Sequence, residues 1–90
     1  MSKREAFCPW ELKGRVMRTL ITENGPERLE LLDGVKFFTD KGWALVLPDA
    51  DKPMFRVYSE GETPEMAETI SDKYLDRIKS IIDISNKQVI

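Results

Sequence analysis

Between residues 28 and 61 the chain carries four short apolar segments, each separated from the next by only a few residues. Asp33-Gly34 and Asp40-Lys41-Gly42 are typical of tight turns between strands. Links this short join antiparallel neighbours, because a parallel pair needs a crossover of a dozen or more residues. The pattern therefore predicts a four-stranded antiparallel sheet over residues 28–61. It also places Phe55 and Val57 on the face of the last strand opposite to Arg56.

Two prolines mark helix starts on either side of this sheet. Pro9 suits the first turn of a helix over 9–24, which the run Asn24-Gly25-Pro26 ends. Thr63 and Pro64 predict a second helix over 63–83, with residues 84–90 as a frayed tail. The order is helix, four strands, helix, so we expect one α+β domain over residues 1–90 with two layers.

Apolar side chains recur at helical spacing in both helices, so we expect each to bury one face. The first stripe consists of Trp10, Met17 and Ile21, widened by Val16 and Leu20, and the second of Met66, Ile70, Tyr74, Ile78 and Ile81, widened by Leu75 and Ile82. Gly14 lies on the stripe of the first helix, where we expect it to allow close approach of a neighbouring element.

Composition excludes several classes of function. A net charge of −2 in 90 residues argues against a nucleic-acid binder, which would show a basic face. The single cysteine, Cys8, and the lack of histidine exclude a disulfide within the chain, a Cys/His zinc site and Ser-His-Asp catalysis. No nearby base would activate Cys8, so no nucleophile is expected there. With no apolar run of membrane-span length, no membrane partner is expected and the chain is predicted to be cytoplasmic.

The segment between the last two predicted strands, residues 48–53, is the main candidate site. It consists of Pro48, Asp49, Ala50, Asp51, Lys52 and Pro53, and Arg56 follows in the next strand. Aspartate and proline favour a simple turn. Two functional alternatives remain: Asp49 and Asp51 could offer oxygens to Mg²⁺, or backbone N–H groups could hold a phosphate. The two carboxylates, offset only by Lys52, disfavour phosphate.

A basic face on the first helix is the second candidate. Glu11 and Arg15 have the spacing of an ion pair, and Arg18 follows one turn later. The face is either solvated or contacts an anion or a preceding domain. Trp10 either seats the start of the helix on the core or has a functional role.

Residues 31–78 resemble the C-terminal domain of the α-D-phosphohexomutases, the phosphomannomutase and phosphoglucomutase family. The resemblance lies in Asp33-Gly34-Val35, Gly42-Trp43, the segment 48–53 and Arg56-Val57-Tyr58 with Glu60. It implies an α+β domain with an antiparallel sheet, whose loop Arg-Pro-Ser-Gly-Thr-Glu-Pro grips the substrate's phosphate. Here Leu47 replaces the arginine, and Asp49, Ala50, Asp51 and Lys52 replace the residues between the prolines.

A narrower resemblance rests on the segments CPWELKGRVMR and LPDADKP. Both are similar to segments of bacterial proteins that join a mannose-1-phosphate guanylyltransferase to a phosphomannomutase-like region. This resemblance implies that earlier domains of a parent chain are partners and that they carry the phosphoserine and Mg²⁺. No cofactor is then expected in this domain, and the parent is an isomerase, a nucleotidyltransferase or both.

These observations predict a C-terminal domain that is not catalytic alone. Its segment 48–53 would face a sugar phosphate or sugar nucleotide, with Lys52 and Arg56 as contacts. The alternative is a non-catalytic interaction module, in which Trp10, Arg15 and Arg18 dock a neighbouring domain or subunit.

Overall fold

A computed structural model describes residues 1–24, 29–31 and 34–88 of the chain. Its elements are β1 (Ser2–Phe7), a 3₁₀ turn η1 (Trp10–Leu12), α1 (Lys13–Asn24), β2 (Leu29–Leu31), β3 (Val35–Thr39), β4 (Gly42–Pro48), β5 (Met54–Gly61) and α2 (Pro64–Gln88). The predicted helix stop at Gly25-Pro26, the turn residue Asp33 and the last two residues of the predicted tail lie outside the described residues.

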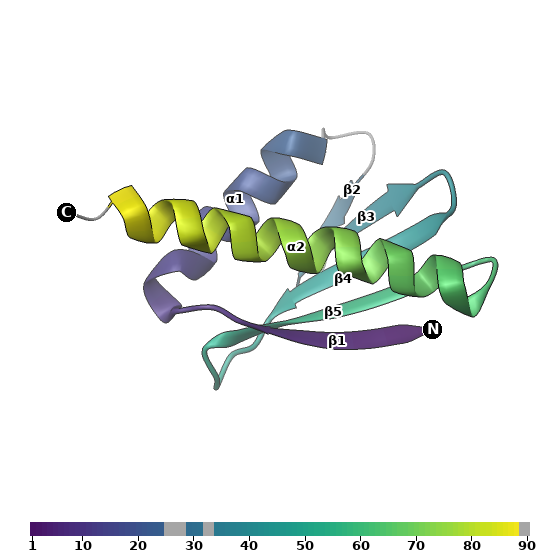
Figure 1. Cartoon of the computed structure of the whole chain (residues 1–90), viewed down its shortest axis with the longest axis horizontal. Helices are drawn as coiled ribbons and strands as arrows, with labels where there is room; N and C mark the ends of the chain where they lie inside the picture. Colours follow the sequence, from purple (N-terminus) through teal and green to yellow (C-terminus); the bar gives the residue numbers. More distant parts are fainter. Residues whose placement is uncertain (25–28, 32–33, 89–90) are drawn as a thin grey trace.

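One antiparallel sheet with strand order β1-β5-β4-β3-β2 forms the first layer. The two helices form the second layer, and α2 runs across the sheet over β5, β1 and β4 (Figure 1). The other helix, α1, contacts β3 and α2. The predicted α+β class, the strands of the predicted meander and the two helices are confirmed.

The sheet contains one strand more than the sequence predicts. Residues Ser2–Phe7 form β1, which pairs with β5 at the edge of the sheet, from Ser2 opposite Ser59 to Phe7 opposite Met54. Its helix-facing positions hold Ser2, Arg4 and Ala6. These residues are small or charged, so the alternation of apolar and polar residues that marks a half-buried strand is missing.

The core lies between the layers. Strand side chains alternate as predicted, and Phe37, Val46, Phe55 and Val57 are fully buried beneath the helices. The ring of Phe37 stacks on that of Tyr74 from α2, with 5.1 Å between ring centroids. Burial of these side chains is the main stabilising contribution, about 1.5–3 kcal/mol for each large apolar side chain.

Both helices differ from their predicted bounds. The first begins as a 3₁₀ turn, and its buried face is Leu12, Val16 and Leu20, whereas Trp10 remains 51% exposed. The second begins as predicted, since the Thr63 hydroxyl accepts a hydrogen bond from the Met66 amide at 3.1 Å. It continues to Gln88, so the predicted tail is wrong for 84–88. Ser85 is buried there, which extends the packed face by one turn.

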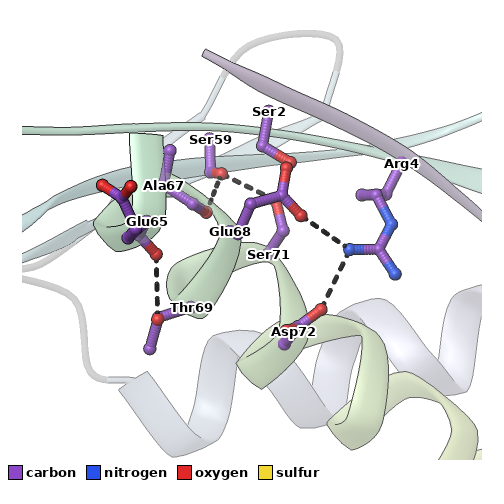
Figure 2. Close-up of polar contacts among 9 residues, drawn as sticks. All are labelled: Ser2, Arg4, Ser59, Glu65, Ala67, Glu68, Thr69, Ser71 and Asp72. Atoms are coloured by element: carbon purple, nitrogen blue, oxygen red, sulfur yellow. Dashed lines mark hydrogen bonds and ion pairs between the residues drawn. The ribbon is translucent and has the colours of Figure 1, made fainter. Parts of the chain in front are cut away.

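A buried row of serines joins α2 to β5 and β1. The Ser59 hydroxyl donates to the Ala67 carbonyl at 2.6 Å, and it lies 2.6 Å from the Ser71 hydroxyl (Figure 2). The Ser71 and Ser2 hydroxyl oxygens are 3.0 Å apart. At the surface beside this row, Arg4 pairs with Glu68 and Asp72. These polar contacts fix the position of α2 along the two strands.

Candidate functional site

Residues 48–53, here called the 48–53 loop, connect β4 to β5 at one end of the sheet. The Asp49 amide donates to the Met54 carbonyl at 3.0 Å, and the Met54 amide donates to the Lys52 carbonyl at 2.8 Å. From the segment after β1, the Cys8 amide donates to the Pro53 carbonyl at 2.9 Å. The loop is therefore held both by its own strands and by the N-terminal segment.

The Asp49 carboxylate is the centre of the loop. Its Oδ1 accepts hydrogen bonds from the backbone amides of Asp51 at 2.8 Å and Lys52 at 2.9 Å. Its Oδ2 accepts two more from Arg56, from Nε at 3.1 Å and Nη2 at 3.0 Å. Only 11% of the Asp49 side chain is exposed. Two backbone donors and one guanidinium fork thus converge on a single anionic group.

These hydrogen bonds change the acidity of both partners. The Asp51 amide, followed by Arg56 and the Lys52 amide, lowers the pKa of Asp49, because each donor favours the ionised carboxylate. The same pairing with Asp49 raises the pKa of Arg56. Asp49 is therefore an anion at neutral pH, and its negative charge is directed into the loop.

Lys13, at the start of α1, holds the loop from the outside. Its ammonium donates to the carbonyl oxygens of both Asp49 and Lys52, the latter at 2.7 Å. It also lies 3.7 Å from the centroid of the Trp10 ring, a cation–π contact. Trp10 therefore packs against Lys13 rather than into the core. The two carbonyl oxygens that Lys13 bonds lie more than 30 residues away in the sequence, so no local pattern indicated these contacts.

The predicted site residues fall into two groups. Asp49 and Arg56 are partly buried and bonded to each other, and Pro48 is the partly buried end of β4. The remaining predicted site residues are exposed along the loop: Ala50, Asp51, Lys52 and Pro53. Among the described residues, no hydrogen bond or ion pair holds the Lys52 ammonium. Of the two predicted contacts, Lys52 is thus free to meet a ligand, and Arg56 is engaged by Asp49.

The other predicted features are located as follows. Cys8 is fully buried, and burial raises the pKa of its thiol, which opposes thiolate formation. Among the described residues, no group of three or more acidic, cysteine or histidine residues is arranged to hold a metal ion. In the same part of the chain, no helix is long and apolar enough to cross a membrane.

The basic face of α1 is exposed at Arg15 and Arg18, and within the described residues no ion pair joins Glu11 to Arg15. A Cβ at Gly14 would meet only the end of the Arg18 side chain, 3.1 Å away. The expectation that Gly14 allows close approach of another element is therefore wrong. Its missing side chain leaves room for the Arg18 guanidinium.

Comparison with known proteins relates the chain to sugar-phosphate mutases. It is 33% identical over 78 residues to a probable phosphoglucosamine mutase of Methanopyrus kandleri, covering 84% of this chain and 17% of that protein. A probable phosphoglucosamine mutase of Pyrococcus horikoshii is 34% identical over 89 residues, which cover 93% of this chain and 20% of that protein. A phosphoglucosamine mutase of Methanococcus maripaludis is 32% identical over 81 residues, which cover 87% of this chain and 18% of that protein. No family model matches the chain.

The chain thus spans 17% to 20% of the length of these relatives. They support the broad resemblance and give no support to the narrower one with guanylyltransferase fusion proteins or to a phosphomannomutase in particular. Over most of its length, the chain is similar to one part of the phosphoglucosamine mutases, which are α-D-phosphohexomutases.

Proposed function

We propose that the chain is the C-terminal domain of a phosphohexomutase-type protein and that it is not catalytic alone. The similarity to one segment of phosphoglucosamine mutases supports this assignment. In the parent protein, the 48–53 loop faces a sugar phosphate or sugar nucleotide, while the phosphoserine and Mg²⁺ belong to preceding domains. The observation that carries the proposal is the exposed position of Lys52 in a loop whose backbone is fixed by Lys13 and by the Met54 amide.

Lys52 is the residue through which this loop contacts the ligand. Its side chain is exposed at the tip of the loop, and within the described residues its ammonium has no partner. Its carbonyl is fixed by Lys13 and by the Met54 amide, so the backbone below the side chain is held in place. Arg56 acts as a positioning residue, because its guanidinium is bonded to Asp49.

An amide NMR titration of the 90-residue chain tests this function. The ligands are glucosamine 1-phosphate, mannose 1-phosphate, glucose 1-phosphate and GDP-mannose, each with and without Mg²⁺. We expect saturable shifts confined to residues 47–56, and a weaker response in Lys52→Gln. Lys41→Gln is the matched control, because Lys41 is an exposed lysine in the turn at the opposite end of β4. A flat response of the folded chain would contradict the proposal, as would equal binding by Lys52→Gln.

A second candidate is a non-catalytic interaction module, favoured by two exposed aromatic side chains next to the loop. Phe7 is 68% exposed and Trp10 is 51% exposed, on either side of the Cys8 amide that bonds to the loop. Exposed aromatic residues are enriched at protein interfaces. If this surface mediates self-association, analytical ultracentrifugation will show oligomers that Trp10→Ser disrupts. A monomer at all concentrations would contradict that version.

A further inference from the structure

The donors around Asp49 form an anion site that the chain fills itself. Consecutive backbone N–H groups together with a planar guanidinium are the groups that hold phosphate or carboxylate oxygens in proteins. Here the Asp51 and Lys52 amides meet Oδ1 of Asp49, and the fork of Arg56 meets Oδ2, all within 3.1 Å. No second anion can use these hydrogen bonds while the carboxylate remains in place.

Displacing this carboxylate is costly for an external phosphate. Asp49 is part of the loop, so it competes intramolecularly, at an effective concentration on the order of millimolar or above. The displaced carboxylate would also stay close to the incoming dianion, and Asp51 adds a second negative charge two residues away. The Lys13 ammonium fixes the Asp49 and Lys52 carbonyls and so limits the movement of the loop that would be needed to turn Asp49 outward.

We propose that Asp49 is a built-in ligand that closes the anion site of the 48–53 loop, so that a phosphate group enters this site only when the Asp49 carboxylate is removed. Asp49 thereby determines which ligand class the loop accepts. A phosphate must be met from outside by Lys52, because the donors that are bonded to Asp49 cannot hold it. This inference takes one point from the proposed function, namely that the 48–53 loop is the segment that faces the ligand.

The test uses inorganic phosphate alone and a matched pair of variants. Asp49→Ser removes the internal anion and leaves the Arg56 guanidinium unpaired, whereas Asp51→Ser removes the same charge from the same loop without freeing any donor. We expect the Arg56 Nε–H signal of the wild-type chain to be unmoved by phosphate, because that donor stays bonded to Asp49. Asp49→Ser should show saturable shifts with a Kd lower by at least about tenfold, or about 1.4 kcal/mol. Asp51→Ser should respond like the wild type.

Three results would overturn the inference. These are phosphate binding by the wild-type chain as tight as by Asp49→Ser, an equal gain in Asp51→Ser, and no gain in a folded Asp49→Ser. If Asp49→Ser does not fold, an NMR titration of the wild-type chain tests the inference instead. The Arg56 Nε–H signal must then titrate together with the Asp49 carboxyl and remain unchanged by phosphate at neutral pH. Separate titration of the Arg56 Nε–H, or a phosphate-induced shift of that signal, would contradict the inference.

The same data separate this inference from the proposed function. If sugar phosphates leave the wild-type chain unchanged but phosphate binds to Asp49→Ser, the proposed function fails and the role of Asp49 stands. If sugar phosphates shift the Lys52 signals of the wild type but Asp49→Ser gains no phosphate affinity, the proposed function stands and the inference about Asp49 fails.

Discussion

The Lys13 ammonium donates a hydrogen bond to the Lys52 carbonyl oxygen 2.7 Å away, across 39 residues of sequence. This contact joins the segment around Cys8–Arg18 to the segment 47–53, the two stretches on which the narrower sequence resemblance rests. The second bond of Lys13, to the Asp49 carbonyl, and the bond from Cys8 to Pro53 strengthen the same junction. The two stretches thus form one structural unit, in which the start of the first helix supports the loop.

Replacing Lys13 with methionine should loosen this loop. The variant Lys13→Met keeps an unbranched chain against Trp10 but removes the ammonium that donates to the Asp49 and Lys52 carbonyls. We expect a loss of about 1 kcal/mol in the free energy of unfolding. The amides of residues 49–53 should also exchange faster with solvent. Urea unfolding and hydrogen exchange measure both effects. Lys41→Met, on an exposed turn, should change neither, and equal effects of the two substitutions would contradict the role of Lys13.

Acid should destabilise the chain through Asp49. Its pKa is lowered in the folded state, mainly by the Asp51 amide and then by Arg56, from an ordinary value of about 3.9. The stabilisation is therefore complete above that ordinary value and is lost as the pH falls through the lower folded-state pKa. Glu23, whose pKa is lowered by its hydrogen bonds to Arg77, contributes in the same direction. Urea midpoints measured between pH 7 and pH 2 should fall, and Asp49→Asn should make the fall shallower. An unchanged pH profile in Asp49→Asn would show that the carboxylate is not held as described.

The buried serines should be coupled in energy. Ser71→Ala removes the hydroxyl between Ser59 and Ser2, all three of which are at most 3% exposed, and should cost about 1–2 kcal/mol. Combined with Ser59→Ala, the loss should be smaller than the sum of the single losses, because both variants break the same contact. Thr69→Ala is the control, since among the described residues that exposed hydroxyl of α2 bonds only the Glu65 carbonyl of its own helix. Additive losses would contradict the coupling.

Two glycines should respond to alanine in opposite directions. A Cβ at Gly42 would lie 1.9 Å from the Glu60 carbonyl oxygen of the paired strand β5, so Gly42→Ala should destabilise by about 1–3 kcal/mol. At exposed Gly14 the nearest atom is the mobile end of Arg18, so Gly14→Ala should stabilise α1 by up to about 1 kcal/mol. Thermal unfolding of the two variants compares them directly. Destabilisation by Gly14→Ala would mean that Arg18 cannot move away.

The sequence predicted the parts of the fold that have strong local signals. Alternation around Phe55 and Val57, short turns, and the Thr63 cap placed the strands and the start of α2 correctly. It missed β1, because a strand whose inward residues are Ser2, Arg4 and Ala6 buries too little apolar surface to show a pattern. It also ended α2 too early, since polar Ser85 gives no sign that it is buried.

The candidate site was predictable only as a segment. Prolines and aspartates marked a loop between two strands, and that loop is present. The pairing of Asp49 with Arg56 depends on the register that sets Leu47 opposite Arg56, which composition does not specify. The contribution of Lys13 depends on how α1 packs beside the loop, a long-range property of the fold.

The place of β1 at the sheet edge has a consequence for the order of folding. The pairs β2–β3, β3–β4 and β4–β5 join strands that follow one another in the chain, whereas β1 pairs with β5 and sets Ser2 opposite Ser59. Closing that long loop costs chain entropy that only the finished partner strand can offset. We therefore expect β1 to pair last, after β5 has formed.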